Sequence, residues 1–149
     1  MSSIRLAVLA VLLFAVPVRA EELECLTTAW KLLGANHKVC VQAFDDPDIP
    51  CVTCYLSQAK KGGISGAVGL AEDPAEFSIE CVQTCPTASL PDKLPKTKKV
   101  FSESTSVFFK DTEITRIYDA KRKTLVYLAI SRKIIEGSPK NAISTVVLR

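Results

Sequence analysis

The chain has 149 residues, of which 48% are hydrophobic and 23% charged, with six cysteines and a formal net charge of +3. This length and composition fit one compact domain and exclude a disordered tail, a collagen-like fibre and a coiled coil. The first twenty residues contribute two arginines and no acid, so the rest of the chain carries 17 basic against 16 acidic residues. Such a balanced charge argues against a nucleic-acid binder, which needs clustered lysine and arginine.

The N-terminal residues have the pattern of a cleavable secretory signal. Arg5 supplies the positive charge, residues 6–16 form an apolar run, and Val18 and Ala20 are small residues at the −3 and −1 positions of a cleavage site. The apolar run is shorter than the roughly 20 residues that a membrane-spanning helix needs. We therefore expect a signal peptide over residues 1–20 and a single mature domain over 21–149 that is exported and has no stable membrane insertion.

The first part of the mature chain is typical of strands separated by turns. Residues 37–44 alternate apolar and polar side chains, and the acidic, proline-rich segment 45–50 then breaks the run. Residues 52–57 and 77–83 favour two further strands. The segment 60–70 between them has glycines three apart, a spacing that matches neither the dinucleotide fingerprint nor the phosphate loop, and it predicts a closely packed loop or a short helix.

Residues 86–99 contain three prolines and four lysines, which predicts an exposed, extended connection. Three segments then favour strands: 100–110, 112–118 and 124–131. The last two form the clearest hairpin. Because 124–131 is apolar on both sides, we expect this strand to be buried on both faces and central in its sheet. A turn or one helical turn over 136–141, with Ser138 as N-cap and Pro139 at N1, and a final strand over 143–148 complete the chain.

All six cysteines lie in the mature part, and an even number in an exported protein indicates structural disulfides, with fifteen formal pairings. Cys51-x-x-Cys54 followed by Cys81-x-x-x-Cys85 also has features of a four-thiolate zinc site, and Cys51 with Cys54 has the spacing of a thiol oxidoreductase. A redox pair normally opens a helix, whereas the residues around Cys54 are β-branched and aromatic. Disulfides are therefore the preferred interpretation, with a redox or metal function as the alternative.

A cluster of acidic residues is the other candidate site. Asp45, Asp46 and Asp48, together with Glu72 and Asp73, could provide oxygen ligands for Ca²⁺ or a surface for a ligand or partner. The spacing of an EF-hand is absent. Asp-Pro pairs also nucleate turns through side-chain bonds to the backbone, and this is the simpler interpretation.

No catalytic constellation is found in the sequence. His37 is the single histidine, and no oriented partner can be named for it, so we expect a solvated turn histidine. Tyr55, Tyr118 and Tyr127 lie in strand patterns and are expected to be core or sheet-face residues. The protein is therefore predicted not to be an enzyme and to use no cofactor.

The order of several motifs resembles that of one family. The motifs are Ala43-Phe44-Asp45-Asp46-Pro47-Asp48, Val52-Thr53-Cys54-Tyr55, Gly69-Leu70-Ala71-Glu72-Asp73, Tyr118-Asp119-Ala120-Lys121-Arg122 and Glu136-Gly137-Ser138-Pro139-Lys140-Asn141-Ala142-Ile143-Ser144. They run from about Lys31 to Val146 and are similar to the CreA family, catabolite regulation protein A. The resemblance implies a small periplasmic protein of Gram-negative bacteria that is associated with catabolite regulation, and it implies no molecular activity.

The resemblance also supports one disulfide, because the family pattern has cysteines at the positions of Cys54 and Cys81. Facing residues of antiparallel strands have a constant index sum, and the pair Cys51–Cys85 differs from that sum by one, so both bridges fit one strand pair. The remaining two cysteines pair by elimination. The predicted pairs are Cys54–Cys81, Cys51–Cys85 and Cys25–Cys40. Their Cα separations are expected within about 4.4–6.8 Å.

Together these patterns predict a mainly antiparallel β domain, a sandwich or bent meander with one or two short helices and disulfide staples. We expect it to bind an envelope protein or a small ligand without catalysis. The alternative is a thiol-redox or metal-binding envelope protein that uses Cys51 and Cys54 with Cys81 and Cys85.

Overall fold

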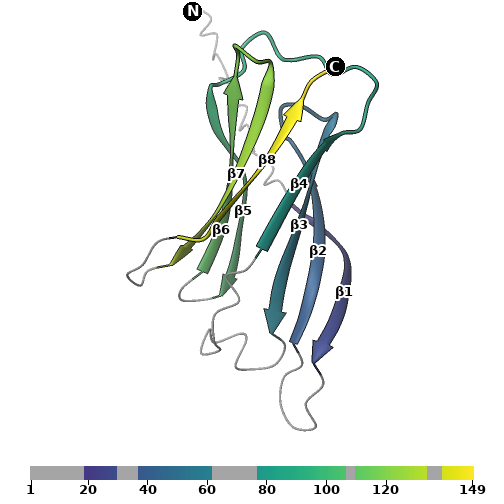
Figure 1. Ribbon diagram of the computed structural model, residues 1–149, viewed down its shortest axis with the longest axis vertical. Coiled ribbons are helices and arrows are strands. Elements are labelled where there is room, and N and C mark those ends of the chain that lie inside the picture. Colours follow the sequence, from purple (N-terminus) through teal and green to yellow (C-terminus); the bar gives the residue numbers. More distant parts are fainter. Residues whose placement is uncertain (1–18, 30–36, 62–76, 107–109, 134–138) are drawn as a thin grey trace, which may run out of the picture.

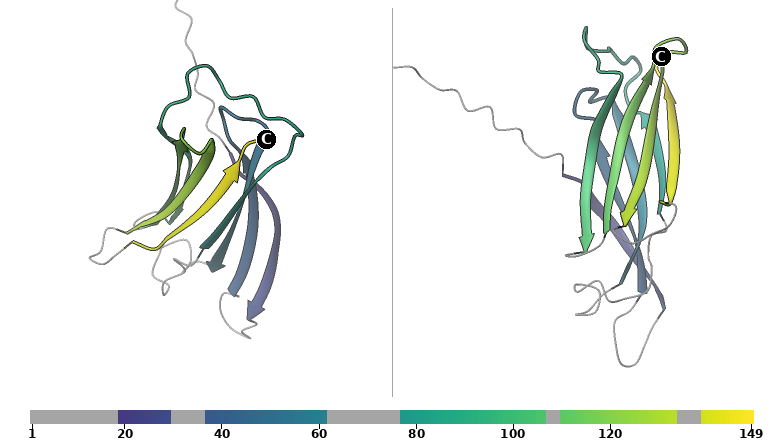
Figure 2. Two further views of the ribbon diagram at one scale, coloured as in Figure 1. Left: turned by 45° about the horizontal axis from the view of Figure 1, so that its top comes forward. Right: turned by 90° about the vertical axis from the view of Figure 1, so that its left-hand side faces the viewer.

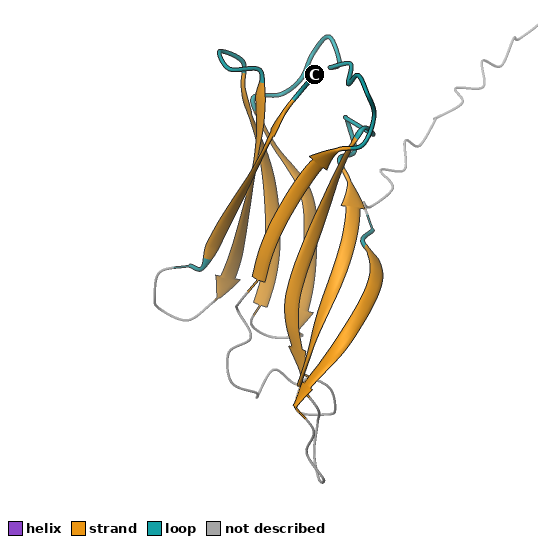
Figure 3. Ribbon diagram, turned by 45° about the vertical axis from the view of Figure 1, so that its right-hand side comes forward, coloured by secondary structure: helices purple, strands orange, loops and turns teal. Residues whose placement is uncertain are grey.

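The computed structural model describes residues 19–29, 37–61, 77–106, 110–133 and 139–149. The described residues form eight strands: β1 (Glu21–Ala29), β2 (His37–Asp45), β3 (Val52–Lys61), β4 (Phe77–Gln83), β5 (Thr97–Ser106), β6 (Lys110–Asp119), β7 (Thr124–Lys133) and β8 (Asn141–Val147). The predicted antiparallel β class is confirmed, and no helix is present in these ranges (Figure 3). A helical turn is not seen at Pro139 and Lys140, and Asn141 is the first residue of β8; residues 136–138 lie outside the described ranges.

The strands form two four-stranded sheets, with the orders β1-β2-β3-β4 and β5-β6-β7-β8. Each sheet is an antiparallel meander in which every strand pairs with its neighbour in the sequence. The two sheets face each other as layers, and β4 lies beside β8 at one side of the sandwich (Figure 1). The N-terminal half of the domain therefore forms the first sheet, and the C-terminal half forms the second.

Alternating side chains produce the core, because every second residue of a strand points to the same face. Leu56 on β3 and Ile114 on β6 are fully buried between the sheets, and Phe44 on β2 stacks on Phe101 on β5 with ring centroids 4.6 Å apart. The buried apolar residues form one cluster: Phe44, Ile49, Val52, Cys54, Leu56, Ile79, Cys81, Val100, Phe101, Ile114, Leu125, Tyr127, Ala129 and Val146. Burial of this cluster holds the two meanders together.

Strand β7 corrects one expectation. It is central, between β6 and β8, but only one of its faces is fully buried. Leu125 and Ala129 have no exposed surface, whereas Val126 and Leu128, which point the other way, are half-buried. The described part of the chain places no third layer over this outer face, so its apolar residues keep contact with solvent.

The beginning of the domain also differs from expectation. The sequence pattern did not indicate β1, because its residues are mostly exposed and show no apolar alternation. His37 is the first residue of β2 and is half-buried, so it is a strand residue rather than a solvated turn residue. β1 begins at Glu21, where the mature chain is predicted to start. Residues 1–18 lie outside the described ranges, and within those ranges no helix has the length and apolarity that a membrane crossing requires.

Candidate functional site

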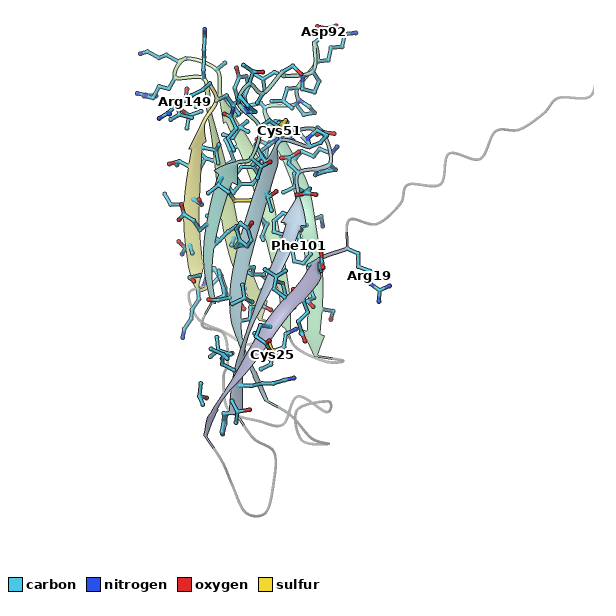
Figure 4. All side chains as sticks on the ribbon, turned by 90° about the vertical axis from the view of Figure 1, so that its right-hand side faces the viewer. Arg19, Cys25, Cys51, Asp92, Phe101 and Arg149 are labelled. Carbon is cyan, nitrogen blue, oxygen red and sulfur yellow. A yellow bond between two sulfur atoms is a disulfide. The ribbon has the colours of Figure 1, made fainter. Side chains whose placement is uncertain are left out.

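The six cysteines form three disulfides, Cys25–Cys40, Cys51–Cys85 and Cys54–Cys81, which are the pairs that the sequence predicted. Cys25 and Cys51 lie at different heights on the sandwich (Figure 4). The Cys51–Cys85 bridge has a Cα separation of 5.2 Å and lies just beyond the last paired residues of β3 and β4. The other two separations are 4.0 Å, shorter than expected, because these cysteines face each other directly across neighbouring strands.

This pairing separates the cysteines of the predicted redox or metal site. Cys51 and Cys54 bond to different partners, and none of the six cysteines is free. A disulfide sulfur is not the thiolate that acts as nucleophile or zinc ligand. Glu22 lies near Cys25 and Cys40, which could suggest a metal site. The sulfurs of these two cysteines are joined in a disulfide, so they are not thiolate ligands either. The geometry therefore favours structural bridges over the alternative interpretation.

Asp46 builds the turn between β2 and β3. Its Oδ1 atom accepts hydrogen bonds from the backbone N–H groups of Asp48 (2.9 Å) and Ile49 (3.1 Å). Its own N–H donates to the carbonyl of Val52 at 2.9 Å. The turn-forming interpretation of the acidic residues is thus confirmed for Asp46. Its side chain is fully buried, so it is not part of an exposed ligand surface.

The other acidic candidates are not brought together with Asp46 on a surface. Asp45 is exposed and accepts a hydrogen bond from the hydroxyl of Thr53 at 2.6 Å. Asp48 is partly buried and bonds inward, toward the second sheet. Glu72 and Asp73 lie outside the described residues.

Arg116 on β6 is the partner of this turn. Its Nη1 atom donates to Asp46 Oδ1 at 2.5 Å, and its Nη2 atom donates to Asp48 Oδ2 at 2.7 Å. The hydroxyl of Tyr127 on β7 donates to the other Asp46 oxygen at 2.7 Å, and Lys98 on β5 contacts Asp48 Oδ1 at 2.6 Å. These five residues, here called the charge network, join the turn of the first sheet to three strands of the second sheet. The side chains of Arg116 and Asp46 have 0% exposure.

Burial and charge shift the acid–base equilibria of the charge network. For Asp48, burial raises the pKa, but hydrogen bonds from Lys98 and Arg116 outweigh it and hold the pKa below the ordinary value. For Arg116, burial lowers the pKa, but hydrogen bonds to Asp48 and Asp46 outweigh this effect and hold the pKa above its ordinary value. Burial, followed by the negative charge of Asp46, raises the pKa of Tyr127 well above its ordinary value. Arg116 and Asp48 are therefore charged at neutral pH, and Tyr127 is a neutral hydrogen-bond donor.

The charge network acts as a clamp between the two sheets. A buried ion pair adds little net stability by itself, but removal of one partner leaves an uncompensated buried charge. The sequence contains a signal for this buried cation. The inward positions on β6 are Thr112, Ile114 and Arg116. Strand alternation therefore buries the charged side chain of Arg116, and a buried charge needs a partner.

A second polar layer lies toward the other end of the core. The amide of Gln58 on β3 donates to the Thr112 hydroxyl at 2.8 Å, and both residues are buried. The buried amide of Gln42 on β2 contacts Glu103 on β5. Lys60 pairs with Glu22 of β1 at 3.0 Å, and this bond lowers the pKa of Glu22. The apolar core is therefore bounded by polar contacts between the sheets on two sides.

The outer side of the second sheet carries a group of apolar side chains on β6, β7 and β8, beside the ion pairs that Glu113 makes with Lys99 and Arg132. Leu128 on β7 faces Ile143 on β8 across the ladder, and Ile117 on β6 faces Val126 on β7. The apolar residues that point outward are Ile117, Val126, Leu128, Ile130, Ile143 and Val147, here called the outer apolar face. Ile143 is 63% exposed and Val147 is 61% exposed. An antiparallel sheet normally presents polar residues on its solvent side, so this face is a candidate contact surface.

The fold and these contacts define a disulfide-stapled β sandwich with a buried ionic clamp and an apolar outer face. Comparison with known proteins identifies the family: a family model described as CreA protein matches residues 23–149. The chain belongs to the CreA protein family, as the sequence motifs indicated.

Three curated relatives illustrate this membership. The chain is 50% identical over 131 residues to Protein CreA of Escherichia coli strain K12, an alignment that covers 85% of this chain and 83% of that protein. The same values are found for Protein CreA of Escherichia coli O6:H1 (strain CFT073) and of Escherichia coli O157:H7. No solved structure matches the chain.

Proposed function

We propose that this CreA family protein is an exported periplasmic protein that binds an envelope protein without catalysis, in association with catabolite regulation as the family resemblance implies. Export is supported by the three disulfides, because such bridges persist in oxidising compartments. The leader-like residues 1–20 support the same location.

The observation that carries the binding function is the outer apolar face. Its two most exposed members, Ile143 and Val147, lie on the edge strand β8, and Leu128 continues the surface onto β7. Contiguous exposed apolar area marks sites of protein contact. The face is part of a regular sheet rather than a concave pocket, so it suits another protein better than a small ligand.

The charged groups of the core support binding over catalysis, because their hydrogen bonds join the two sheets to each other. The groups with shifted pKa values in the core are Asp48, Arg116 and Tyr127. Perturbed pKa values occur at active sites, but also in structural ion networks. Here Arg116 donates to Asp48 and Asp46, and Tyr127 donates to Asp46, across the interface between the sheets.

Site-specific photo-crosslinking in the periplasm tests the proposal. A photoreactive residue replaces Leu128 on the outer apolar face, and the matched control replaces Glu80, an exposed residue of β4 on the first sheet. The expected result is a defined adduct with an envelope protein at position 128 and none at position 80. The adduct should disappear when Val126→Glu places a charge beside the crosslinker. Equal labelling at both positions, or none at position 128, would contradict the proposal.

A further inference from the structure

The edges of the two sheets are protected to very different degrees. β1 and β5 each contain two register shifts, and they carry charged residues such as Glu22 and Lys99. Bulges and charges are the features by which natural sheets prevent edge pairing. β8 pairs with β7 without any register shift, and residues 141–148 include no charged residue and no proline. Compared with the edge strands β1 and β5, β8 therefore has the features that allow another strand to pair with it.

The alternation of hydrogen bonds shows which backbone groups of β8 are available. The N–H of Ser131 donates to the carbonyl of Lys140, and the N–H of Leu148 donates to the carbonyl of Lys123. In an antiparallel ladder such pairs recur at every second residue. The even-numbered residues of β8 therefore bond to β7, and the N–H and C=O groups of the odd-numbered residues point to the free edge. Within the described ranges, these groups of Ile143, Thr145 and Val147 meet no other strand.

β4 lies beside this edge without closing it. The backbone N–H of Cys81 donates to the hydroxyl of Ser144 at 2.8 Å. The side-chain amide of Gln83 also exchanges two hydrogen bonds with the backbone of Arg149, just after the end of β8. Beside these contacts, a groove of about 410 Å³ separates residues of β4 such as Gln83 from residues of β8 such as Thr145 and Val147. β8 stands at the margin of the second sheet (Figure 2).

We propose that a second copy of this chain covers the edge, with β8 pairing antiparallel to β8 of the second copy about a two-fold axis at Ser144. This inference goes beyond the proposed function. The axis places Ile143 opposite the second copy's Thr145, so that outward-pointing N–H and C=O groups meet in register. Self-pairing sets a strand against an identical strand, so that like charges on it would lie close together. The uncharged β8 avoids the repulsion that Glu21, Glu22 and Glu24 would cause in β1.

The dimer also joins two outer apolar faces. Ile143 of each copy then lies diagonally across from Ile143 and Val147 of the other copy, on one eight-stranded sheet. The protein surface offered to an envelope partner is doubled, although each copy keeps its own face on β6 and β7. Crosslinking at Leu128 does not require the dimer, so failure of one proposal is distinguishable from failure of the other.

Sedimentation equilibrium of the mature chain, with and without substitution at Thr145, tests the pairing. Thr145→Pro removes an N–H that points to the free edge, and it leaves the bonds to β7 intact. Two N–H groups are lost per dimer, so the dissociation constant should rise about tenfold or more. Thr145→Val keeps the N–H and is the matched control, with the dimer unchanged. A wild-type monomer at all concentrations, or a Thr145→Pro dimer of unchanged affinity, would overturn the proposal.

Amide hydrogen exchange of the unmodified mature protein gives a second readout that does not depend on the folding of a variant. The amides of Ile143, Thr145 and Val147 should exchange about tenfold more slowly when the concentration passes the dimer dissociation constant. The amide of Leu23 on β1 is the internal control and should not change. Protection at every concentration, or only after addition of an unrelated extended peptide, would reject the second copy as the occupant.

Discussion

The hydroxyl of Tyr127 on β7 donates a 2.7 Å hydrogen bond to Asp46, a residue of the turn between β2 and β3. One carboxylate thus serves two purposes, because its other oxygen organises the turn and accepts from Arg116. The turn of the first sheet and the centre of the second sheet are held by the same buried charge. The ionic clamp should therefore dominate the effect of substitutions at this end of the sandwich.

Arg116→Ala should lower the free energy of unfolding by about 3–5 kcal/mol, because it leaves the buried carboxyl group of Asp46 without its cationic partner. Chemical denaturation measures this difference. The control is Arg122→Ala, which removes an exposed pair with Asp119 and should cost no more than about 1 kcal/mol. Equal losses in both variants would show that the charge network is not the clamp described here.

Stability should fall in acid through Asp48. Its pKa in the folded protein is below the ordinary value of 3.8, which the unfolded chain retains. The folded state therefore binds fewer protons, and the stabilisation is fully present above about pH 5 and lost as the pH falls below about 4. Denaturation at several pH values should show a shallower acid loss for Asp48→Asn than for the wild type. Parallel curves for the two proteins would refute this assignment.

The three disulfides should differ in their resistance to reduction. Cys51 and Cys85 are half-buried, whereas Cys54 and Cys81 are buried in the core. Graded reduction followed by alkylation and peptide mapping should therefore label Cys51 and Cys85 first. Replacement of both Cys54 and Cys81 by alanine should lower the free energy of unfolding by about 2–4 kcal/mol and lead to degradation in the periplasm. Labelling of Cys54 before Cys51 would contradict the observed burial.

Processing of the leader is tested by intact-mass measurement of the exported protein. The mature chain should begin at Glu21, the first residue of β1, and should be released by osmotic shock. The physical reason is the short apolar run, which falls below the length of a membrane-spanning helix. A mass that retains residues 1–20, or release only with detergent, would contradict the prediction.

His37→Ala should change the free energy of unfolding by no more than about 0.5 kcal/mol. Thr28 contacts the backbone carbonyl of His37, so the described contact survives the substitution. Denaturation and a cellular assay of catabolite regulation should both be close to those of the wild type. Loss of the cellular effect by a fully folded variant would point to a role for the imidazole and would weaken the non-enzymatic proposal.

Most of the fold could be predicted because alternation is strong where one side of a strand is buried. Strands β2, β4 and β7 were expected within two residues of their observed ends. β1 could not be found in this way, since an exposed edge strand needs no apolar alternation. The two-sided burial predicted for β7 was wrong because an apolar pattern cannot tell a covered face from a contact surface.

The candidate site was harder to predict than the fold. The bridge Cys54–Cys81 follows from the register of two neighbouring strands, which local sequence determines. The contact between Asp46 and Arg116 joins residues 70 positions apart in different sheets, and no local pattern fixes how the sheets face each other. The charge of Arg116 at an inward position could have predicted a buried partner, but not which one.

All three disulfides belong to the first sheet, and the second sheet contains none. A chain that enters an oxidising compartment with its N-terminus leading has all six cysteines available once residue 85 has crossed, before any strand of the second sheet arrives. The covalent framework can then be completed on a four-stranded half, and the later half assembles on it as on a template. For a chain exported in this way, vectorial entry and local, sequential strand pairing would work in the same direction and would limit the time in which cysteines can form incorrect bridges.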